Sequence, residues 1–302
     1  MIAASILNFN HVKLKENFPM ISQKFGIIGG DMRQYYLAES LKKDGHKIQI
    51  TGFENYKIKT DFIDNCTLSD ISENSDYIIL PLPISRDGIN LISPFSEKKL
   101  NLDFIKNLEN KKIFGGSIPD TINLKISTNS KIYDFYREDL MILNAVPTAE
   151  GAVIEAFKNL DKTISSSNCL VAGYGRIGKV LCNLLKNMGA KVTATMRSSK
   201  DFAWAKVQNI KSTTFENSIA KYDVIFNTIP TTVFDYNYLT KIPKSTIIID
   251  LASKPGGVDK VSAEKLGIKV IHALGLPGKY FPKTAGEIIK TVIYKIIEEE
   301  NL

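Results

Sequence analysis

The chain has 302 residues, which suits two domains of about 150 residues each better than one core. With 44% hydrophobic and 24% charged residues it is typical of globular proteins, and a disordered or fibrous chain is excluded. The formal net charge of +7 fits a surplus of surface lysines or attraction of an anionic small substrate. Because no basic run is interleaved with aromatics and no zinc-finger spacing is present, we expect no nucleic-acid binding.

The cysteine and hydropathy patterns predict a cytoplasmic protein without a metal and without membrane association. Three cysteines lacking a C-x-x-C pair cannot form a disulfide framework, and His11, His46 and His272 lie too far apart in sequence to suggest a zinc site. No apolar run approaches the roughly 18 residues of a membrane span. Residues 1–7 lack the charged start of a signal peptide, so export is not expected.

The first half of the chain begins like an α/β unit. A short apolar strand over residues 25–28 leads through Gly29 and Gly30 into a helical pattern over residues 32–43. Asp31 is placed to cap this helix, and Gly45 suits its end. Further strands are expected over residues 47–51, 77–80 and 112–114. Strands that alternate with helical stretches predict a parallel sheet.

A second α/β unit begins near Asn168. A strand over residues 169–172 runs through a glycine-rich loop into a helix over residues 179–187. More strands are expected over residues 191–196, 224–226, 246–251 and 269–272, and residues 144–150 and 165–167 are expected connectors. Residues 275–278 are expected to form a loop. The amphipathic helix over residues 284–299 needs a partner for its apolar stripe, and we expect it to cross back to the first domain.

These elements predict the α/β class, with two Rossmann-like domains that have parallel sheets and are separated by a cleft. The expected boundaries are an N-terminal substrate-side domain over residues 1–147 and a nucleotide-binding domain over residues 148–280. Residues 281–302 are expected to be the C-terminal helix that returns to the first domain.

The pattern Gly173-x-Gly175-x-x-Gly178 carries the strongest chemical signal. The first glycine permits the tight turn, the second lets the backbone approach a pyrophosphate, and the third lets the helix pack on the strand. An accidental glycine cluster is the alternative, but the strand before it and the helix after it favour dinucleotide binding. The loop residues expected at the cofactor are Gly173, Tyr174, Gly175, Arg176, Ile177 and Gly178.

The end of the following strand indicates which dinucleotide binds. NAD-binding domains carry an acid there, whereas this chain has Arg197 and Ser198 within residues 196–200, a stretch with no carboxylate to repel a phosphate. A guanidinium suits a 2′-phosphate, so NADP is predicted, with NAD as the alternative if Arg197 is only a solvated surface residue. Residues at later strand ends are expected to border the cofactor, namely Thr228, Ile229, Pro230, Ala252 and Ser253.

Candidate groups for substrate and proton lie outside the glycine-rich loop. The Gly29-Gly30 turn has no third glycine for helix packing, so a dinucleotide should bind poorly there. Arg33, in the first turn of the next helix, suits a substrate carboxylate or a structural salt bridge equally well. Lys254 follows a strand whose end should border the cofactor, and it could pair with a carboxylate. Asp250 is interpreted as a residue that only stabilises the turn. His272 is either an acid/base group or a structural histidine.

Longer motifs resemble the family of the dipicolinate synthase A subunit of spore-forming bacteria. They are Ile28-Gly29-Gly30-Asp31-x-Arg33, Arg137-Glu138-Asp139, Pro147-Thr148-Ala149-Glu150-Gly151, residues 250–257, and residues 275–278 with 282–286. The resemblance runs from Gly26 to Glu299. It implies oxidation of a dihydrodipicolinate-type intermediate of the lysine pathway to pyridine-2,6-dicarboxylate with reduction of NADP. It also implies a flavoprotein-like partner, the dipicolinate synthase B subunit, with a role in sporulation in the mother cell.

The chain is also similar to the wider superfamily of D-2-hydroxyacid and formate/glycerate dehydrogenases. That resemblance implies a nucleotide domain inserted in the chain and a last helix that returns to the first domain. The superfamily's substrate arginine corresponds to Lys254 here, and its late catalytic histidine has no clear counterpart in residues 273–278. The departure argues against ordinary hydroxyacid chemistry.

Aromatisation of a dihydropyridine requires loss of a hydride and one proton, which water or a modest base can accept. The site must mainly position a planar dianion. Arg33 and Lys254 are the expected cations, Thr148 and Lys283 complete the expected substrate set, and His272 is the candidate proton acceptor. Two alternatives stay open: a dehydrogenase of another small carboxylate, and a non-catalytic nucleotide-binding subunit. Also open are the base, a homo-oligomeric state, the activity of the chain alone and its stoichiometry with the B subunit.

Overall fold

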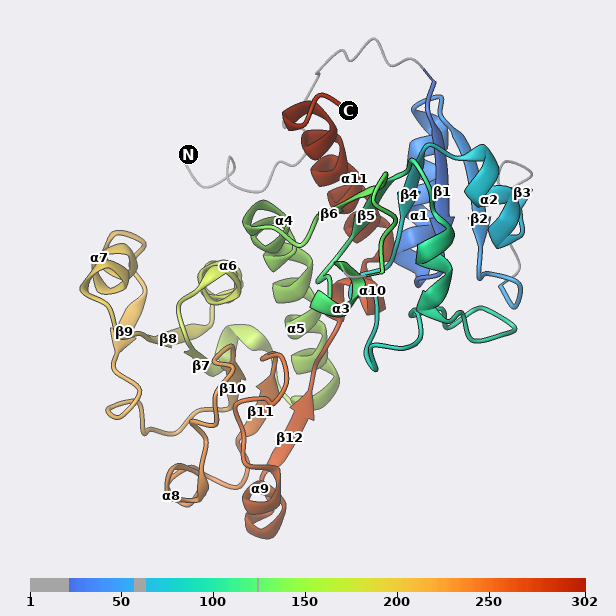
Figure 1. Cartoon of the computed structure of the whole chain (residues 1–302). Coiled ribbons are helices and arrows are strands. Elements are labelled where there is room, and N and C mark those ends of the chain that lie inside the picture. The colour runs from blue at the N-terminus through green and yellow to red at the C-terminus, as the bar shows by residue number, and fades with distance from the viewer. Residues whose placement is uncertain (1–21, 57–63, 124) are drawn as a thin grey trace.

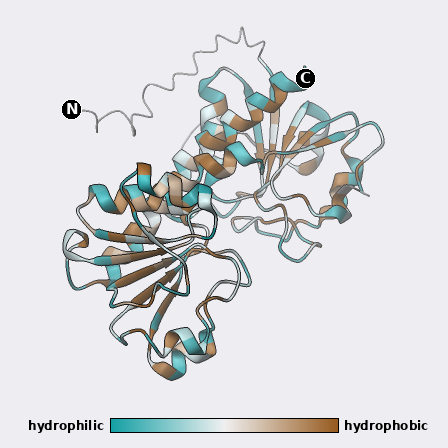
Figure 2. Cartoon of the chain, turned by 90° about the vertical axis from the view of Figure 1, so that its left-hand side faces the viewer, coloured by the Kyte–Doolittle hydropathy of each residue, from teal (hydrophilic) through white to brown (hydrophobic). Residues whose placement is uncertain are grey.

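The computed structural model describes residues 22–56, 64–123 and 125–302. Residues 1–7 and His11, which entered the expectations on export and metal, lie outside these ranges. The described chain forms two domains, each built around a six-stranded sheet (Figure 1). Apolar residues line the strands inside both domains, and hydrophilic residues lie on the outer helices and loops (Figure 2).

The first sheet has the strand order β3-β2-β1-β4-β5-β6, and all its pairs are parallel. Its strands are β1 (Lys24–Ile28), β2 (Lys47–Thr51), β3 (Asp64–Asn65), β4 (Tyr77–Ile79), β5 (Lys112–Gly115) and β6 (Lys131–Asp134). The connecting helices are α1 (Met32–Lys43), α2 (Leu68–Asn74), the 3-10 helix η2 (Leu102–Asn107) and α3 (Asp120–Asn123). Asp31 caps α1 through a capping box, as its position before the helical pattern predicted.

The second sheet has the order β12-β11-β10-β7-β8-β9 and is also parallel throughout. Its strands are β7 (Asn168–Ala172), β8 (Lys191–Thr195), β9 (Lys211–Thr213), β10 (Val224–Asn227), β11 (Ile247–Asp250) and β12 (Lys269–His272). Its helices are α6 (Arg176–Asn187), α7 (Ser199–Val207), α8 (Tyr236–Leu239) and α9 (Lys260–Leu266). Numbered within each domain, both sheets have the order 3-2-1-4-5-6 of dinucleotide-binding folds. The predicted class, α/β with two Rossmann-like parallel sheets, is confirmed.

The domains are joined by α4 (Glu138–Leu143), α5 (Ala145–Asn159) and the 3-10 turn η3 (Ile164–Ser166), and later by α10 (Leu276–Tyr280) and α11 (Pro282–Glu299). The last helix packs along α1 in the first domain (Figure 1). Its buried stripe joins the core of that domain, through Ile288, Ile289, Val292, Ile293 and Ile296. A Cβ added at Gly286 would stand 2.7 Å from the carbonyl oxygen of Arg33, so this glycine lets the two helices approach closely.

Some local expectations were wrong, for identifiable reasons. The expected connector over residues 144–150 is helical: it leads into α5, which joins the domains, and Pro147 falls in the first turn, where a missing N–H is tolerated. The expected loop over residues 275–278 turns into α10, with Pro277 again near the helix start. The short strands β3, β6 and β9 were missed because polar residues make up half or more of each, in the sequences DN, KIYD and KST.

One stretch passes a test of length and composition for a membrane span, contrary to the expectation that none would. It is Glu138–Asn159, which comprises α4 and α5. Half of its apolar window is buried inside the structure, and Ala149, Ala152 and Ala156 belong to the core of the second domain. A buried core helix passes the same test, so this stretch is weak evidence for a membrane span.

Candidate active site

The glycine-rich loop between β7 and α6 has the geometry that a pyrophosphate requires. Gly173 has a φ of +95°, a conformation that favours glycine. A Cβ added at Gly178 would stand 2.2 Å from the carbonyl oxygen of Gly173, so only glycine fits there. A Cβ at Gly175, in contrast, would meet nothing within 4 Å. The loop therefore leaves open space at the position where a phosphate must approach the backbone.

The amino-terminal end of α6 is suited to hold that phosphate. Its N-cap is Gly175, which offers no side chain to bond the first-turn N–H groups. Such groups and the helix dipole favour a bound anion. The residues present therefore fit a nicotinamide dinucleotide in the second domain.

The other residues of the loop have distinct roles. The Tyr174 side chain is buried and donates its hydroxyl to Gln208 Oε1 at 2.6 Å, and burial raises the pKa of Tyr174 to about 12. Ile177 packs against the core of the domain. Arg176 carries an exposed guanidinium that pairs with Glu138 of α4. Tyr174 and Ile177 can thus contribute backbone, whereas Arg176 can contribute charge.

The first glycine turn, between β1 and α1, lacks this free anion site. The backbone N–H groups of Gly29 and Gly30 already donate to carbonyl oxygens of the chain, at 2.9 and 2.7 Å. The capping box between Asp31 and Gln34 bonds the start of α1. Because these N–H groups are already bonded within the chain, the first domain offers a dinucleotide fewer free donors than the second domain does.

At the end of β8 the environment of the expected 2′-phosphate is more mixed than predicted. Arg197 is exposed, as a phosphate ligand requires. Ser198 caps α7, and its hydroxyl donates to Asp201 Oδ2 at 2.7 Å. Asp201 also lies 3.4 Å from Lys179. Residues 196–200 themselves carry no carboxylate, and Asp201, which follows them directly, is engaged by Ser198 and Lys179.

At the carboxyl ends of β10 and β11 a buried polar pair holds the two loops expected at the nicotinamide. Asn227 Nδ2 donates to Asp250 Oδ1 at 2.8 Å, and both side chains are fully buried. Asp250 also accepts the backbone N–H groups of Ala252 and Gly257, each at 3.2 Å. Sequence reasoning missed this role, although a polar residue at the end of each of two apolar strands was the available signal.

The predicted cofactor residues that follow β10 and β11 lie on these two loops. Thr228 donates its hydroxyl to the carbonyl oxygen of Ala172 at 2.8 Å, and Ile229 exchanges bonds with the Asn227 amide. Pro230 and Ser253 are exposed, and Ala252 is buried. In a sheet of this order the fourth to sixth strands serve the nicotinamide half, so the predicted set lies at one edge.

Lys254 and His272 lie at the same edge. Lys254 is exposed, in the loop that follows β11. His272 Nδ1 lies 3.5 Å from Asp250 Oδ2, and its side chain is 30% exposed. The histidine is therefore held beside a buried carboxylate while one side of its ring reaches solvent, which an acid/base group requires.

Arg33 forms the structural salt bridge that the sequence left as one alternative. Its Nε and one terminal nitrogen donate to the Asp31 carboxylate, both at 2.9 Å, and that terminal nitrogen also donates to the Leu82 carbonyl oxygen at 2.6 Å. Burial works against the charge of Asp31, but the bonds from Arg33 outweigh it and hold the pKa of Asp31 below its usual value. A Cβ at Gly278 would lie 3.1 Å from Arg33 Nε, so α10 of the second domain packs against this pair.

The remaining substrate candidates lie on α5 and α11. The Thr148 hydroxyl donates to the Asn144 carbonyl oxygen at 2.6 Å. Lys283 is exposed in the first turn of α11. Because Gly286 meets the start of α1 while Lys290 bonds Asp44 at its end, the two helices run parallel. Both helices therefore begin at the end of the first domain that α10 contacts; the start of α1 is already capped by the Asp31 carboxylate, whereas the start of α11 has no side-chain cap and favours an anion.

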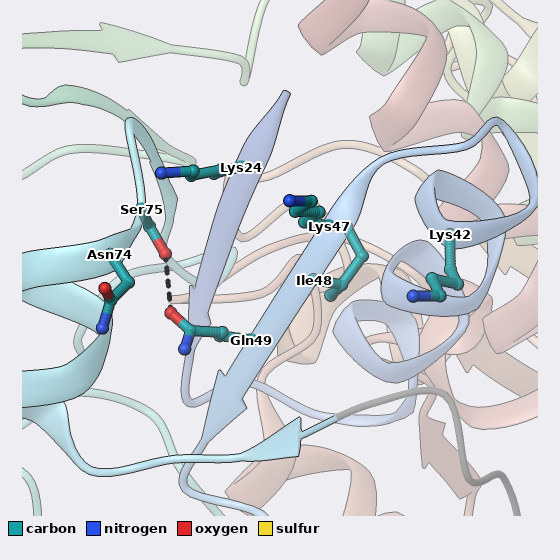
Figure 3. Close-up of a pocket in the computed structure, with 7 residues that line it drawn as sticks. All are labelled: Lys24, Lys42, Lys47, Ile48, Gln49, Asn74 and Ser75. Atoms are coloured by element: carbon teal, nitrogen blue, oxygen red, sulfur yellow. Dashed lines mark hydrogen bonds between the residues drawn. The ribbon is translucent and has the colours of Figure 1, made fainter. Parts of the chain in front are cut away.

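A separate hollow of about 310 Å³ lies in the first domain, beside the amino-terminal ends of β1 and β2 (Figure 3). Its lining residues are Lys24, Lys42, Lys47, Ile48, Gln49, Asn74 and Ser75. Lys24 and Lys47 begin β1 and β2, whereas ligands of open α/β sheets bind at the carboxyl ends of strands. The hollow is therefore not part of the candidate active site. Within the described ranges, no cluster of three or more acidic, cysteine or histidine side chains offers a metal site.

Comparison with known proteins gives concordant matches for the two domains. Residues 24–136 match the family described as the N-terminal domain of the dipicolinate synthase A subunit. Residues 146–258 match that of the D-isomer specific 2-hydroxyacid dehydrogenase, NAD binding domain. The dipicolinate synthase A subunit of Bacillus subtilis (strain 168) is 30% identical in a match of 285 positions that covers 91% of this chain and 96% of that protein.

Solved structures agree with these matches. The dipicolinate synthase A subunit from Bacillus halodurans is 31% identical, with a TM-score of 0.83 over 92% of this chain and 99% of that one. The same protein from Bacillus subtilis is 30% identical, with a TM-score of 0.81 over 93% and 97%. D-lactate dehydrogenase from Escherichia coli, at 12% identity and a TM-score of 0.57 over 92% and 97%, shares the fold alone.

Proposed function

Since the chain belongs to the dipicolinate synthase A subunit family and is an NAD(P)-dependent oxidoreductase, we propose that it oxidises a dihydrodipicolinate-type intermediate to dipicolinate with NADP. The observation that carries the proposal is the open glycine-rich loop at the uncapped start of α6. It lies in the domain that matches NAD-binding dehydrogenases.

The cofactor residues divide the work along the edge of the second sheet. Residues 173–178 hold the pyrophosphate, and Arg197 contacts the 2′-phosphate that distinguishes NADP from NAD. The loops after β10 and β11, fixed by Asn227 and Asp250, border the nicotinamide end. When bound, the nicotinamide supplies the hydride acceptor. The Asp201 carboxylate, which bonds Ser198, favours NAD over a nucleotide with a 2′-phosphate, so the nucleotide preference is to be measured directly.

The substrate residues hold a planar dianion at that end. Lys254 supplies a free cation from the second domain, and the start of α11, with Lys283, supplies positive potential from the first. In this proposal Arg33 offers the guanidinium nitrogen that Asp31 and Leu82 leave over, and Thr148 lines the same space. His272 accepts the proton that leaves as the ring becomes aromatic.

We propose further that the protein acts in the cytoplasm of the mother cell during sporulation. Its partner there is the dipicolinate synthase B subunit. Co-purification of the two proteins from sporulating cells, and its loss on deletion of either, tests this part.

The direct test is oxidation of enzymatically generated dihydrodipicolinate by the purified chain with NADP, followed by the absorbance of the reduced nicotinamide. Turnover without a partner supports the proposal. Turnover of a hydroxyacid instead would favour a dehydrogenase of another small carboxylate. Tight NADP binding with no turnover of either substrate would favour a nucleotide-binding subunit whose partner holds the chemistry.

A further inference from the structure

The motif Arg137-Glu138-Asp139 at the start of α4 has no part in the proposed chemistry, yet it connects three helices. Arg137 donates to the Glu299 carboxylate at 2.5 and 3.1 Å. Asp139 accepts from Lys295 at 3.2 Å. Both partners lie on α11, so the outer residues of the motif fasten α4 to the first domain.

The middle residue of the motif points to the other domain. Glu138 pairs with Arg176, the first residue of α6, directly after the N-cap Gly175. The two side chains are 63% and 44% exposed, so solvent and ligands can reach both. One carboxylate of the junction therefore stands beside the position where a pyrophosphate is proposed to bind.

A pyrophosphate at this loop brings negative charge to the same guanidinium. Arginine binds phosphate and carboxylate in the same way, through charge-assisted bonds from its planar fork. Glu138 and a phosphate also repel each other at such a distance. Both anions thus draw on one cation, and the presence of either lowers the gain from the other.

From this arrangement we infer that Glu138 and the nucleotide pyrophosphate compete for Arg176, so that nucleotide binding breaks the ion pair that links α4 to α6. The inference rests on the proposed function, because it requires the dinucleotide at residues 173–178. By linkage, the contact between the domains and the affinity for nucleotide then oppose each other. Glu138 is in this sense a residue that limits nucleotide affinity.

The test measures the Kd of NADPH and of inorganic pyrophosphate by calorimetry. Because an exposed ion pair contributes little, we expect Glu138→Gln to bind both about two- to fivefold more tightly than the unmodified chain. Arg176→Gln should weaken both, and adding Glu138→Gln to it should then have a smaller effect than in the unmodified chain, because only the direct repulsion between Glu138 and the phosphate is left to remove. Glu300→Gln is the matched control, since it removes an exposed carboxylate paired with Lys131 and lies away from the loop.

A second readout follows the loss of this ion pair directly. Hydrogen exchange of the amides of residues 138–143 should become faster when NADPH binds the unmodified chain. In Glu138→Gln it should be fast already and insensitive to NADPH. Slower or unchanged exchange in the unmodified chain would contradict the loss of this ion pair.

The outcomes separate the two proposals. If NADPH does not bind the unmodified chain, the proposed function and the competition both fall. If it binds the unmodified chain and Glu138→Gln with equal affinity, or the variant more weakly, the competition is refuted while the proposed function stands.

Discussion

Two glycines of one loop, Gly175 and Gly178, should respond to substitution in opposite ways. At Gly175 an added side chain meets nothing within 4 Å, and the backbone is extended with a φ of −81°. Gly175→Val should therefore lower the free energy of unfolding by only about 0.5–1 kcal/mol, the difference between glycine and a poor N-cap residue. Its branched side chain nonetheless fills the space that the pyrophosphate needs, so NADPH binding should be lost.

At Gly178 the added Cβ would stand 2.2 Å from a backbone oxygen, which cannot swing aside as a flexible side chain can. The helix must move away from the strand, so Gly178→Ala should destabilise the protein by about 1–3 kcal/mol or more, as overpacking does. For a domain of this size that is a fall in Tm of roughly 2–4 °C for each kcal/mol.

Thermal melts followed by circular dichroism measure the loss of stability, and calorimetric titration measures the binding of NADPH. Gly175→Val should melt near the unmodified chain and bind nothing, whereas Gly178→Ala should melt early. A Gly175→Val protein that binds NADPH normally would mean that the pyrophosphate lies elsewhere. Equal losses of Tm in both variants would refute the assigned packing of the loop.

Three further expectations follow from named side chains. Arg197→Asp should erase the preference for NADPH over NADH, and equal affinities for both in the unmodified chain would contradict the role of Arg197. Lys254→Ala should reduce kcat/KM for the dianion by about 10- to 100-fold with an unchanged Tm, whereas Arg33→Ala should also lower the Tm because Arg33 bonds its own domain. Burial lowers the pKa of His46 below 6.5, so the unfolded chain takes up that proton first. The neutral His46 therefore contributes to the free energy of unfolding above pH 6.5, and this contribution declines as the pH falls from 6.5 through the lower pKa of the folded state. The urea midpoint measured against pH should show this decline. In His46→Gln the midpoint should fall less steeply below pH 6.5.

The sequence predicted best where the deciding interactions are local. The helix over residues 32–43 was predicted with its bounds, because Asp31 and Gly45 mark its ends within a few residues. The glycine-rich loop was predicted because its three glycines lie within six residues of one another, between an apolar strand and a helical pattern. The connector over residues 144–150 was named without its helical conformation, since a proline gives the same local signal in a loop and in a first helical turn.

The candidate site was predicted less completely, because its side chains meet across long stretches of chain. The Asn227–Asp250 bond joins two strand ends 23 residues apart, and only the parallel register of β10 and β11 brings them together. The position of Asp201 beside Ser198 depends on the turn into α7. Arg33 had two equal interpretations, and its bond to the Leu82 carbonyl, 49 residues away, could not be inferred from spacing.

The return of α11 to α1 also fixes an order of events during synthesis. Residues 282–299 follow the whole second sheet in the chain, so their apolar stripe joins α1 and the first core only after that sheet has been synthesised. The strands of the second sheet and helices α6 to α9 emerge earlier and can pack among themselves. The second sheet can therefore pack before the core of the first domain is complete, although that sheet is encoded second.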